Sequence, residues 1–372
     1  MELLQDVSLR GKKVFLRVDF NVPLEKGKIL DNNRIKAAIP TIRFLAESRA
    51  IIIIGTHCGR PEGKPSPETS VALIAKELER VLNLKVLMAE GIVGENIKGV
   101  IDSLHPGQII VLENLRWDPR EEANDPAFAK ELAGYADIYV NDAFAVSHRA
   151  NSSVDAITKF LPSYAGLLMQ SEITNLRLLL EKPVRPFVLI VGGIKVADKA
   201  AMIKRLAPLA DKILVGGGVA NTFLKARGQD IGKSVFDEEM IAECKTMLEK
   251  FGSKIVLPVD SVREDLGSGE FGIMDIGPET RKIFISEILN AKTVLWNGNL
   301  GKSEDEKYRD GMRDVAMAMA KIRQHTVVAG GDTAAFVIEE KLNNGIAFIS
   351  TGGGAALEFL AGEKLPGIEA LR

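Results

Sequence analysis

The segment FVLIVGG, residues 187–193, carries the pattern that predicts the fold of this chain. It is a short run of apolar, mostly β-branched residues closed by glycines, which is typical of a strand buried in a parallel sheet. Similar runs recur along the chain, separated by segments of helical periodicity, which predicts an α/β fold. In the first half they are VFLRVDF (14–20), IIIIG (51–55), KVLMAE (85–90), IIVLENL (109–115) and IYVNDAF (138–144). In the second half they continue with KILVGGG (212–218), KIVLPVD (254–260), TVLWNG (293–298), VVAGGD (327–332) and AFISTGGG (347–354).

The length of the chain predicts two domains. Single hydrophobic cores stop growing near about 250–300 residues, and this chain has 372. Between the two sets of strands lies GLLMQSEITNLRLLLEK, residues 166–182, which is apolar at helical spacing and is followed by Pro183 and Pro186. Because proline interrupts a helix, we expect a connecting helix that ends there and serves as a hinge.

The charge balance argues against nucleic acid or membrane partners. Lysine and arginine total 48 against 50 acidic residues, so the net charge of −2 provides no broad positive field. No signal sequence is evident, and no stretch reaches the roughly 18 apolar residues of a membrane span. The two cysteines, Cys58 and Cys244, are too few for a disulfide framework, so we expect free thiols in a reducing cytoplasm.

The strand ends of the first half are rich in arginine. Ligands of open parallel sheets bind beyond the carboxyl ends of the strands, so these residues are the candidates for a site. Several guanidinium groups together would suit a small substrate that carries more than one anionic group. The alternative is that each arginine forms an ordinary surface ion pair. The residues concerned are Asp19, Asn21, Arg34, His57, Arg60, Arg116, His148 and Arg149.

The strand ends of the second half are rich in glycine instead. Glycine lets the backbone approach a ligand closely, and free N–H groups at a helix start attract phosphate, so a nucleotide is the expected occupant. The alternative is that these turns need glycine only for their own backbone geometry. The glycines are Gly192, Gly193, Gly216, Gly217, Gly218, Gly298, Gly330, Gly331, Gly352, Gly353 and Gly354.

Three charged residues of the second half are candidates for phosphoryl chemistry. Lys195 and Lys199 flank the start of a helical segment, and residues four apart share a helix face, so both ammonium groups could reach the same phosphates. Asp332 follows two glycines and could bind the Mg²⁺ of a nucleotide through its carboxylate. It could equally be an N-cap residue.

Three further features resemble functional motifs, but the residues around them argue against a functional role. GSGEFG (267–272) has the spacing of a dinucleotide fingerprint, yet we expect a loop because a charged run precedes it. GQDIGKS (228–234) misses the spacing of a phosphate-binding loop by one residue and has no strand before it. Cys58 belongs to no nucleophile motif and is interpreted as a small apolar filler.

Ordered motifs along the chain resemble those of the phosphoglycerate kinase family over essentially its whole length. The first half contains RVDFNVP (17–23), NNRIKAA (32–38), GRP (59–61), ENLR (113–116), NDAF (141–144) and HRANSS (148–153). The second half contains GGIKVADK (192–199), LPVD (257–260), DIGPET (275–280), WNG (296–298), GGDT (330–333) and STGGGAALE (350–358). An ordered series of this kind is far more specific than any single glycine motif.

The resemblance implies two Rossmann-like domains, each a parallel sheet flanked by helices, with the substrate cleft between them. It implies a 3-phosphoglycerate domain over 1–165, a hinge helix over 166–182, a nucleotide domain over 183–357 and a returning segment over 358–372. The implied enzyme is a phosphotransferase of glycolysis and gluconeogenesis that moves a phosphoryl group between 1,3-bisphosphoglycerate and ADP–Mg, giving 3-phosphoglycerate and ATP. Transfer would be direct and in line, with hinge closure excluding water, in a cytoplasmic monomer.

The resemblance also implies roles for individual residues, of which Arg34, Lys195 and Lys199 would be catalytic and Asp332 would serve the metal. The residues implied to bind substrate are Asp19, Phe20, Asn21, Arg34, His57, Cys58, Gly59, Arg60, Arg116 and Arg149. Those implied to bind nucleotide are Lys199, Glu304, Gly330, Gly331, Asp332 and Thr333.

Some positions depart from the family pattern and leave two alternatives open. Cys58, Ala145 and Val146, Ile194, Asn299 and Ser303 stand where the family usually has other residues. A noncatalytic relative would fit such departures, although Lys195, Lys199 and Asp332 are retained. A nicotinamide-dependent dehydrogenase would fit the fold, but the required strand, GxGxxG and helix context is missing.

Overall fold

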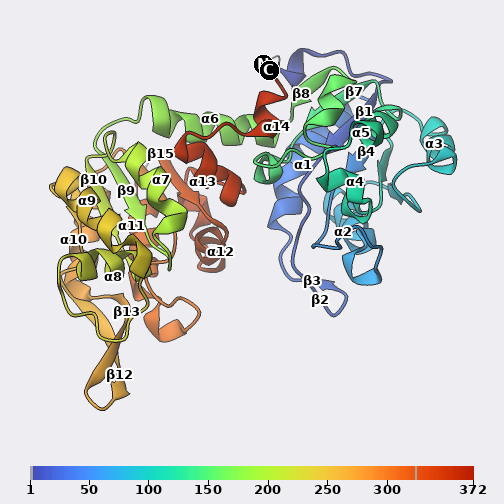
Figure 1. The fold of residues 1–372 in the computed structure, drawn as a ribbon. Helices are drawn as coiled ribbons and strands as arrows, with labels where there is room; N and C mark the ends of the chain where they lie inside the picture. The colour runs from blue at the N-terminus through green and yellow to red at the C-terminus, as the bar shows by residue number, and fades with distance from the viewer. Residues whose placement is uncertain (1–2, 323–324) are drawn as a thin grey trace. The chain divides into compact units, whose positions relative to one another are not determined.

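The computed structural model describes residues 3–322 and 325–372, which form two compact units (Figure 1). Unit 1 contains the chain up to Ile173 together with Lys364–Arg372, and unit 2 contains Thr174–Glu363. Each unit has one six-stranded sheet whose pairings are all parallel, with helices between successive strands. The predicted two-part α/β fold is therefore confirmed.

The sheet of unit 1 has the strand order β5-β6-β4-β1-β7-β8. Strand β1 is central because Val14, Phe15 and Leu16 are fully buried and pack on both faces of the sheet. After β1 the chain builds one side of the sheet through β4, β5 and β6, and then returns to the other side of β1 with β7. The strands are β1 (Lys13–Arg17), β4 (Ile51–Gly55), β5 (Val86–Met88), β6 (Ile109–Val111), β7 (Ile138–Asn141) and β8 (Ser163–Ala165).

The sheet of unit 2 has the order β11-β10-β9-β14-β15-β16, with the predicted segment FVLIV forming its strand β9. All five residues of β9 are buried, and so are all five residues of the neighbouring strand β14. The order in which strands are added reverses between β9 and β14, because β10 and β14 lie on opposite sides of β9. The strands are β9 (Phe187–Val191), β10 (Lys212–Val215), β11 (Ile255–Val256), β14 (Thr293–Asn297), β15 (His325–Ala329) and β16 (Phe348–Ile349).

The helices connect the strands and cover the sheets. Amphipathic helix α2, for example, buries Ile74, Leu78 and Leu82 and ends at Asn83, which adopts the left-handed conformation that stops helices. The helices of unit 1 are α1 (Asn33–Glu47), α2 (Ala72–Leu82), α3 (Glu95–Asp102), α4 (Pro119–Glu122), α5 (Pro126–Ala133) and α14 (Pro366–Glu369). Those of unit 2 are α7 (Ala197–Leu206), α8 (Gly217–Ala226), α9 (Ile241–Phe251), α10 (Pro278–Leu289), α11 (Asp310–Ala320), α12 (Gly331–Glu339) and α13 (Gly354–Ala361). Within the described ranges, no helix has the length and apolar character needed to cross a bilayer.

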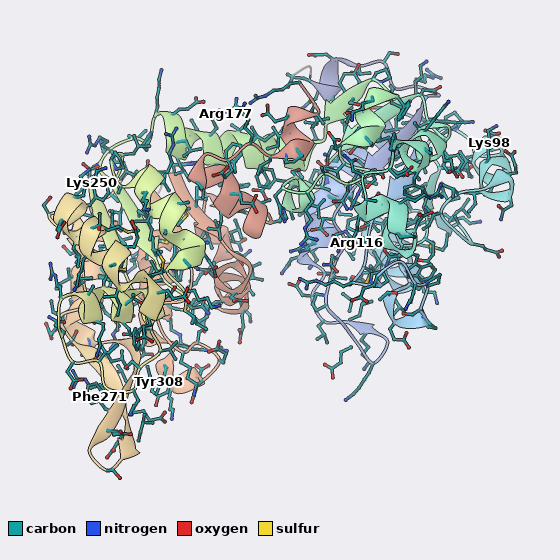
Figure 2. All side chains as sticks on the ribbon, viewed as in Figure 1. Lys98, Arg116, Arg177, Lys250, Phe271 and Tyr308 are labelled. Atoms are coloured by element: carbon teal, nitrogen blue, oxygen red, sulfur yellow. The ribbon has the colours of Figure 1, made fainter. Side chains whose placement is uncertain are left out.

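The structure corrects the interpretation of GSGEFG. Its first residues belong to a two-stranded antiparallel hairpin, β12 (Ser261–Gly267) and β13 (Glu270–Ile276), so a strand does precede the motif. Ser268 and Gly269 form the tight turn with positive φ angles of 56° and 79°. A strand rather than a helix follows, so the motif is still no dinucleotide site. Arg263 lies over the ring of Phe271, labelled in Figure 2, and this contact joins the two strands.

Three other short strands were also missed by sequence reasoning. Strand β8 and the hairpin β2 (Leu24–Glu25) and β3 (Lys28–Ile29) have two or three residues each. Segments this short carry too little alternation to be recognised.

The connecting helix is α6, Leu167–Glu181, at the position that the sequence predicts. The compact division falls within it, after Ile173, and again after Glu363. At the end of the chain, Gly367 N–H donates to the Ser147 carbonyl at 2.9 Å, and Leu365, Ile368 and Leu371 are buried. Helix α13 packs instead on α7 in unit 2. The functional boundaries at 165, 182 and 357 and the hinge role of α6 stay predictions.

Asp142, which directly follows β7 and bonds to the first turn of α6, gives a testable pH dependence of stability. It accepts hydrogen bonds from Leu168 N–H and Met169 N–H at 2.9 and 3.1 Å, but burial raises the pKa of its carboxyl from 3.8 to about 6. Between these values the folded state binds more protons than the unfolded state, so the free energy of unfolding falls as pH rises from about 4 to about 6.

We expect the Asp142→Asn variant to lose this part of the pH dependence. The difference between variant and parent should amount to roughly 3 kcal/mol over that range, since one pKa unit corresponds to about 1.4 kcal/mol. Urea unfolding at a series of pH values measures it. Parallel stability curves for the two proteins would contradict the expectation.

Candidate functional site

The first candidate site lies at the carboxyl ends of β1 and β4 in unit 1. These strands pair in parallel, with Arg17 opposite Gly55, so the loops that follow them lie side by side. Asp19 and Asn21 come from the loop after β1, and His57 comes from the loop after β4. The strand order reverses next to this place, between β1 and β7, and open α/β sheets bind ligands where the strand order reverses.

Side chains from two other segments, those of Arg34 and Arg116, reach the same place. Arg34, in the first turn of α1, forms an ion pair with Asp19. The side chain of Asn21 accepts a hydrogen bond from Gly59 N–H at 2.8 Å and so ties the two loops together. Arg116, labelled in Figure 2, is buried and donates to the Gly59 carbonyl at 3.2 Å.

The charges of this region converge on His57, which is only 2% exposed. Burial lowers the pKa of His57 well below its ordinary value of 6.5, and Arg17, Arg116, Arg34 and Arg149 lower it further. Burial likewise lowers the pKa of the Arg116 guanidinium, with Arg17 and Arg149 adding to the effect and Glu122 opposing it. The structure thus brings together five predicted residues, here named the basic site: Asp19, Arg34, His57, Arg116 and Arg149.

The other residues predicted for this site lie around it in different ways. Phe20 and Cys58 have buried side chains in the core. The Phe20 N–H donates to Thr56 Oγ1 at 2.9 Å, and the Cys58 carbonyl accepts from Asn114 Nδ2 at 2.7 Å. Burial raises the pKa of the Cys58 thiol, with Glu113 adding to the effect, as expected of an unreactive filler. Arg149 is exposed and donates to His148 Nε2 at 3.3 Å. Arg60 is exposed, and within the described residues no electrostatic contact joins it to the basic site.

The second candidate site is a cavity of about 740 Å³ in unit 2, here named the glycine-rich cavity. Glycines from the ends of five neighbouring strands line it, which is the arrangement that the sequence predicts for that sheet edge. They are Gly193 after β9, Gly217 and Gly218 after β10, Gly298 after β14, Gly330 and Gly331 after β15, and Gly353 and Gly354 after β16.

The glycines at this sheet edge have two different kinds of surroundings. A Cβ atom on Gly192 would lie 2.2 Å from the Asn299 carbonyl oxygen, so the turns after β9 and β14 need glycine to pack on each other. A Cβ on Gly331, Gly353 or Gly354 would meet no atom within 4 Å. Both helices that start at these open positions, α12 and α13, lack a side-chain cap. Packing therefore accounts for Gly192, whereas Gly331, Gly353 and Gly354 border open space, and the nucleotide expected there stays a prediction.

The predicted charged residues line the same cavity. Helix α7 begins at Ala197, so Lys195 precedes it and the two lysines do not share a helix face, yet both border the cavity. Burial lowers the pKa of Lys199, while Asp198 and Asp332 oppose this. Asp332 is the second residue of α12 and caps nothing, so the N-cap alternative is wrong. Glu304 and Thr333 also line the cavity, and Thr333 Oγ1 accepts from Gly298 N–H at 2.9 Å.

Sequence reasoning missed several residues of this cavity. Asn297 is 2% exposed, donates to the Ala329 carbonyl at 2.7 Å, and its Oδ1 has no partner among the described residues. Asn297 lies at the end of a strand, within the motif WNG (296–298), and this position could have identified it as a candidate site residue. In the atypical loop, Asn299 Nδ2 donates to Ser303 Oγ at 2.8 Å. Ile194 and Val235 are 64% and 59% exposed and line the same cavity.

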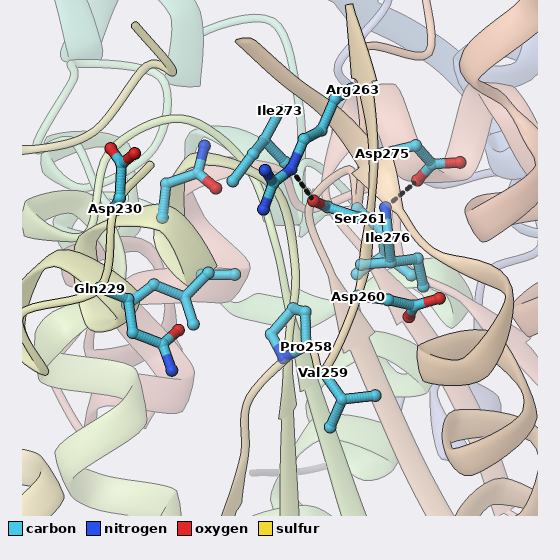
Figure 3. A pocket seen from close by; sticks show the side chains of 15 residues that line it. Gln229, Asp230, Pro258, Val259, Asp260, Ser261, Arg263, Ile273, Asp275 and Ile276 are labelled. Carbon is cyan, nitrogen blue, oxygen red and sulfur yellow. Dashed lines mark hydrogen bonds between the residues drawn. The ribbon is translucent and has the colours of Figure 1, made fainter. Parts of the chain in front are cut away.

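A smaller cavity of about 70 Å³ adjoins the glycine-rich cavity (Figure 3). The two share the lining residues Gly217, Asn221, Ile273, Asp275 and Leu300. Its polar side chains are largely engaged. Arg263 Nε donates to Ser261 Oγ at 3.2 Å, and Asp275 accepts from Ile276 N–H and Gly311 N–H at 2.8 Å each. These bonds fix the hairpin and the start of α11, so this cavity is a structural feature.

Comparisons with known proteins agree with this geometry. The family model described as phosphoglycerate kinase matches residues 4–363. The phosphoglycerate kinase of Chloroflexus aggregans is 43% identical over 392 residues, covering 99% of this chain and 98% of the relative. That of Coprothermobacter proteolyticus is 43% identical over 385 residues, with the same coverage.

Two solved structures are similar over the whole chain. Phosphoglycerate kinase from Coxiella burnetii has a TM-score of 0.88 at 36% identity, and the enzyme from Pyrococcus horikoshii has 0.89 at 34%. Each comparison covers 100% of this chain and 98% of the solved one. The dehydrogenase and noncatalytic alternatives are thereby set aside in favour of a phosphotransferase. The chain belongs to the phosphoglycerate kinase family.

Proposed function

We propose that this chain carries out the family reaction with 3-phosphoglycerate on the basic site of unit 1 and the nucleotide in the glycine-rich cavity of unit 2. The observation that carries this assignment is the contrast between the two strand edges. One gathers guanidinium groups around a buried neutral histidine, and the other gathers glycines, two lysines and one carboxylate. Each set matches the chemistry of one of the two substrates.

The basic site suits a small molecule that carries a phosphate and a carboxylate. Arg116 and Arg149 would hold the phosphate, because guanidinium groups bind its oxygens in pairs, and Arg34 would lie near the reacting carboxyl. The ion pair between Arg34 and Asp19 supports this role, since it fixes the orientation of a side chain that is otherwise 36% exposed. Asn21 and Gly59 keep the two loops in register.

The glycine-rich cavity suits a nucleoside di- or triphosphate. The open glycines at the starts of α12 and α13 leave backbone N–H groups accessible to phosphate oxygens, and the helix dipoles favour negative charge there. Gly330, Gly331 and Thr333 belong to this edge. Lys199 would pair with the phosphates and Glu304 with the ribose hydroxyls.

The residues of this cavity fit a magnesium ion that arrives with the nucleotide. Within the described ranges no three His, Cys, Asp or Glu side chains are grouped as a complete metal site. Asp332 lines the cavity with a carboxylate that makes no capping bond, and Mg²⁺ bound to substrate phosphates commonly takes one protein carboxylate. Bound there, the ion would neutralise charge on the phosphate oxygens.

Transfer would be direct, because the substrate carboxylate is itself the nucleophile and needs no general base. Lys195 and Arg34 would stabilise the charge that develops on the phosphoryl oxygens during transfer. The reaction requires the two bound substrates to meet with water excluded, and we assign this movement to the hinge helix α6.

The test is a coupled assay with 3-phosphoglycerate, ATP and magnesium, run beside NAD reduction on candidate hydroxy acids. We expect acyl phosphate formation that depends on magnesium, and no nicotinamide chemistry. Magnesium-independent turnover would remove Asp332 from its role, and absence of acyl phosphate would overturn the proposal.

The Arg149→Ala variant tests the phosphate contact of the basic site. We expect the KM for 3-phosphoglycerate to rise by about tenfold, since a hydrogen bond to a charged group contributes about 1.5–3 kcal/mol and Arg149 is exposed. The KM for ATP should stay unchanged. Arg80→Ala is a matched control, because Arg80 is an exposed arginine of unit 1 that pairs with Glu77 on α2. An unaltered saturation curve for 3-phosphoglycerate would remove Arg149 from the site.

We further propose a cytoplasmic monomer. The location is supported by Cys58 and Cys244, which are both buried free thiols and suit a reducing compartment. The monomeric state follows the family resemblance. Light scattering of the purified protein measures the oligomeric state, and a dimer mass would contradict the proposal.

A further inference from the structure

A buried polar network lies directly behind the basic site and has no part in the roles given above. Its centre is Arg17, the last residue of β1, which is only 1% exposed. Arg17 Nε donates to Ser153 Oγ at 2.7 Å, and Nη1 donates to the Val18 carbonyl. Glu121 of α4 is fully buried and accepts from Ser153 N–H at 3.0 Å and from Ser153 Oγ at 2.5 Å. Its carboxylate lies 3.9 Å from Arg17 Nη2 and offsets the buried positive charge.

The same guanidinium contacts His57. Arg17 Nη2 lies 3.3 Å from His57 Nδ1. A guanidinium group has donors only, so Nδ1 must carry the lone pair and accept this hydrogen bond. The proton of a neutral imidazole then resides on Nε2. The carboxylate oxygen Asp19 Oδ1 is 3.9 Å from Nδ1, which is too far for it to accept a hydrogen bond from that nitrogen.

The surroundings of His57 also oppose the doubly protonated form. The charged groups that face it are Arg17 from β1, Arg34 from α1, Arg116 and Arg149 from later loops, and Asp19. Four of these five are cations, and an imidazolium would direct an Nδ1–H toward the guanidinium of Arg17. His57 is therefore held neutral with one defined donor, Nε2–H.

We propose that Arg17 is a positioning residue that fixes His57 as the Nε2–H tautomer, so that Nδ1 accepts from Arg17 and Nε2–H is left to donate to the anionic substrate. This inference rests on the proposed function, because it takes His57 to contact 3-phosphoglycerate. Without Arg17 the ring could take the Nδ1–H tautomer, and the donor toward the substrate would be lost in that part of the population.

The direct test is the protonation state of the His57 ring in the free protein. The chain has only four histidines, so a long-range ¹H–¹⁵N correlation spectrum of the imidazole rings is simple, and a His57→Gln variant assigns the signals. We expect the parent protein to show the Nε2–H tautomer from about pH 6 to pH 8. An Nδ1–H tautomer or an imidazolium at pH 7 would overturn the proposal.

Two variants test the cause. Arg17→Lys keeps a charge opposite Glu121 but loses the fork of donors, and Arg17→Met combined with Glu121→Gln removes both buried charges, so that neither is left uncompensated. We expect mixed tautomers of His57 in both. The KM for 3-phosphoglycerate should rise about tenfold in both variants. The ratio of the variant KM to the parent KM should change between pH 6 and pH 8. Tyr139→Phe is the control, because Tyr139 donates to the Ser153 carbonyl at 2.7 Å and does not touch His57.

The outcomes separate the two proposals. Variants that keep the Nε2–H tautomer and the parent KM would overturn the role of Arg17. Tautomer changes equal to those in Tyr139→Phe would likewise overturn it, because general loosening would then explain them. If the tautomer follows Arg17 as expected but the parent enzyme shows no dependence on 3-phosphoglycerate, the role of Arg17 stands and the proposed function falls.

Discussion

Replacing Lys195 by alanine is expected to lower kcat by about 10²–10³-fold while changing the KM of either substrate by less than about tenfold. Lys195 is exposed at the edge of the glycine-rich cavity, and among the described residues it makes no ion pair. Its ammonium group is therefore free to meet charge that appears only during transfer. An interaction made only in the transition state raises kcat and leaves KM nearly unchanged.

Lys204→Ala is the matched control for this prediction. Lys204 lies on the following helix, α7, and pairs with Glu243 outside the cavity. Its removal should leave the kinetic constants unchanged. Unchanged turnover in a folded Lys195→Ala protein would show that the phosphoryl group is stabilised by other residues.

Replacing Arg34 by alanine is expected to lower kcat/KM for 3-phosphoglycerate by about 10²–10³-fold. The change removes a cation near the reacting carboxyl and leaves the carboxylate of Asp19 without its partner, facing an anionic substrate. The double variant Asp19→Asn and Arg34→Ala should recover part of the loss, because the repulsion is removed. Steady-state kinetics of the two variants at saturating ATP measures both effects.

Arg43→Ala is the control, since Arg43 is exposed on the same helix and lies outside the basic site. If the KM for ATP rose as much as that for 3-phosphoglycerate, the assignment of Arg34 to the acid substrate would be wrong.

Much of this architecture could be predicted from the sequence because buried parallel strands are short runs of apolar, β-branched residues that are easy to recognise. Runs such as IIIIG and FVLIV leave little choice of structure, and each became a fully buried strand, β4 and β9. The residues after each strand could then be grouped by edge, since parallel strands end on the same side. That step was enough to bring the arginines to one edge and the glycines to another.

What could not be predicted depends on contacts between distant segments. The hairpin β12 and β13 is rich in charge and glycine, so its sequence favours a loop, and only cross-strand contacts such as Arg263 with Phe271 define it. Whether a glycine serves packing or leaves room for a ligand depends on which loop lies opposite it, as Gly192 and Gly331 show. Arg17 lies in an apolar run, and nothing local reveals that Glu121 and Ser153 are its partners.

Hydrogen exchange with each ligand alone tests the central claim most directly, since it asks which unit each substrate protects. We predict that 3-phosphoglycerate slows amide exchange at residues 56–60 and 147–150 of unit 1, and that Mg–ADP slows it at residues 192–199 and 330–335 of unit 2. Protection of the unit 2 segments by 3-phosphoglycerate, or of the unit 1 segments by Mg–ADP, would contradict the assignment of the two sites.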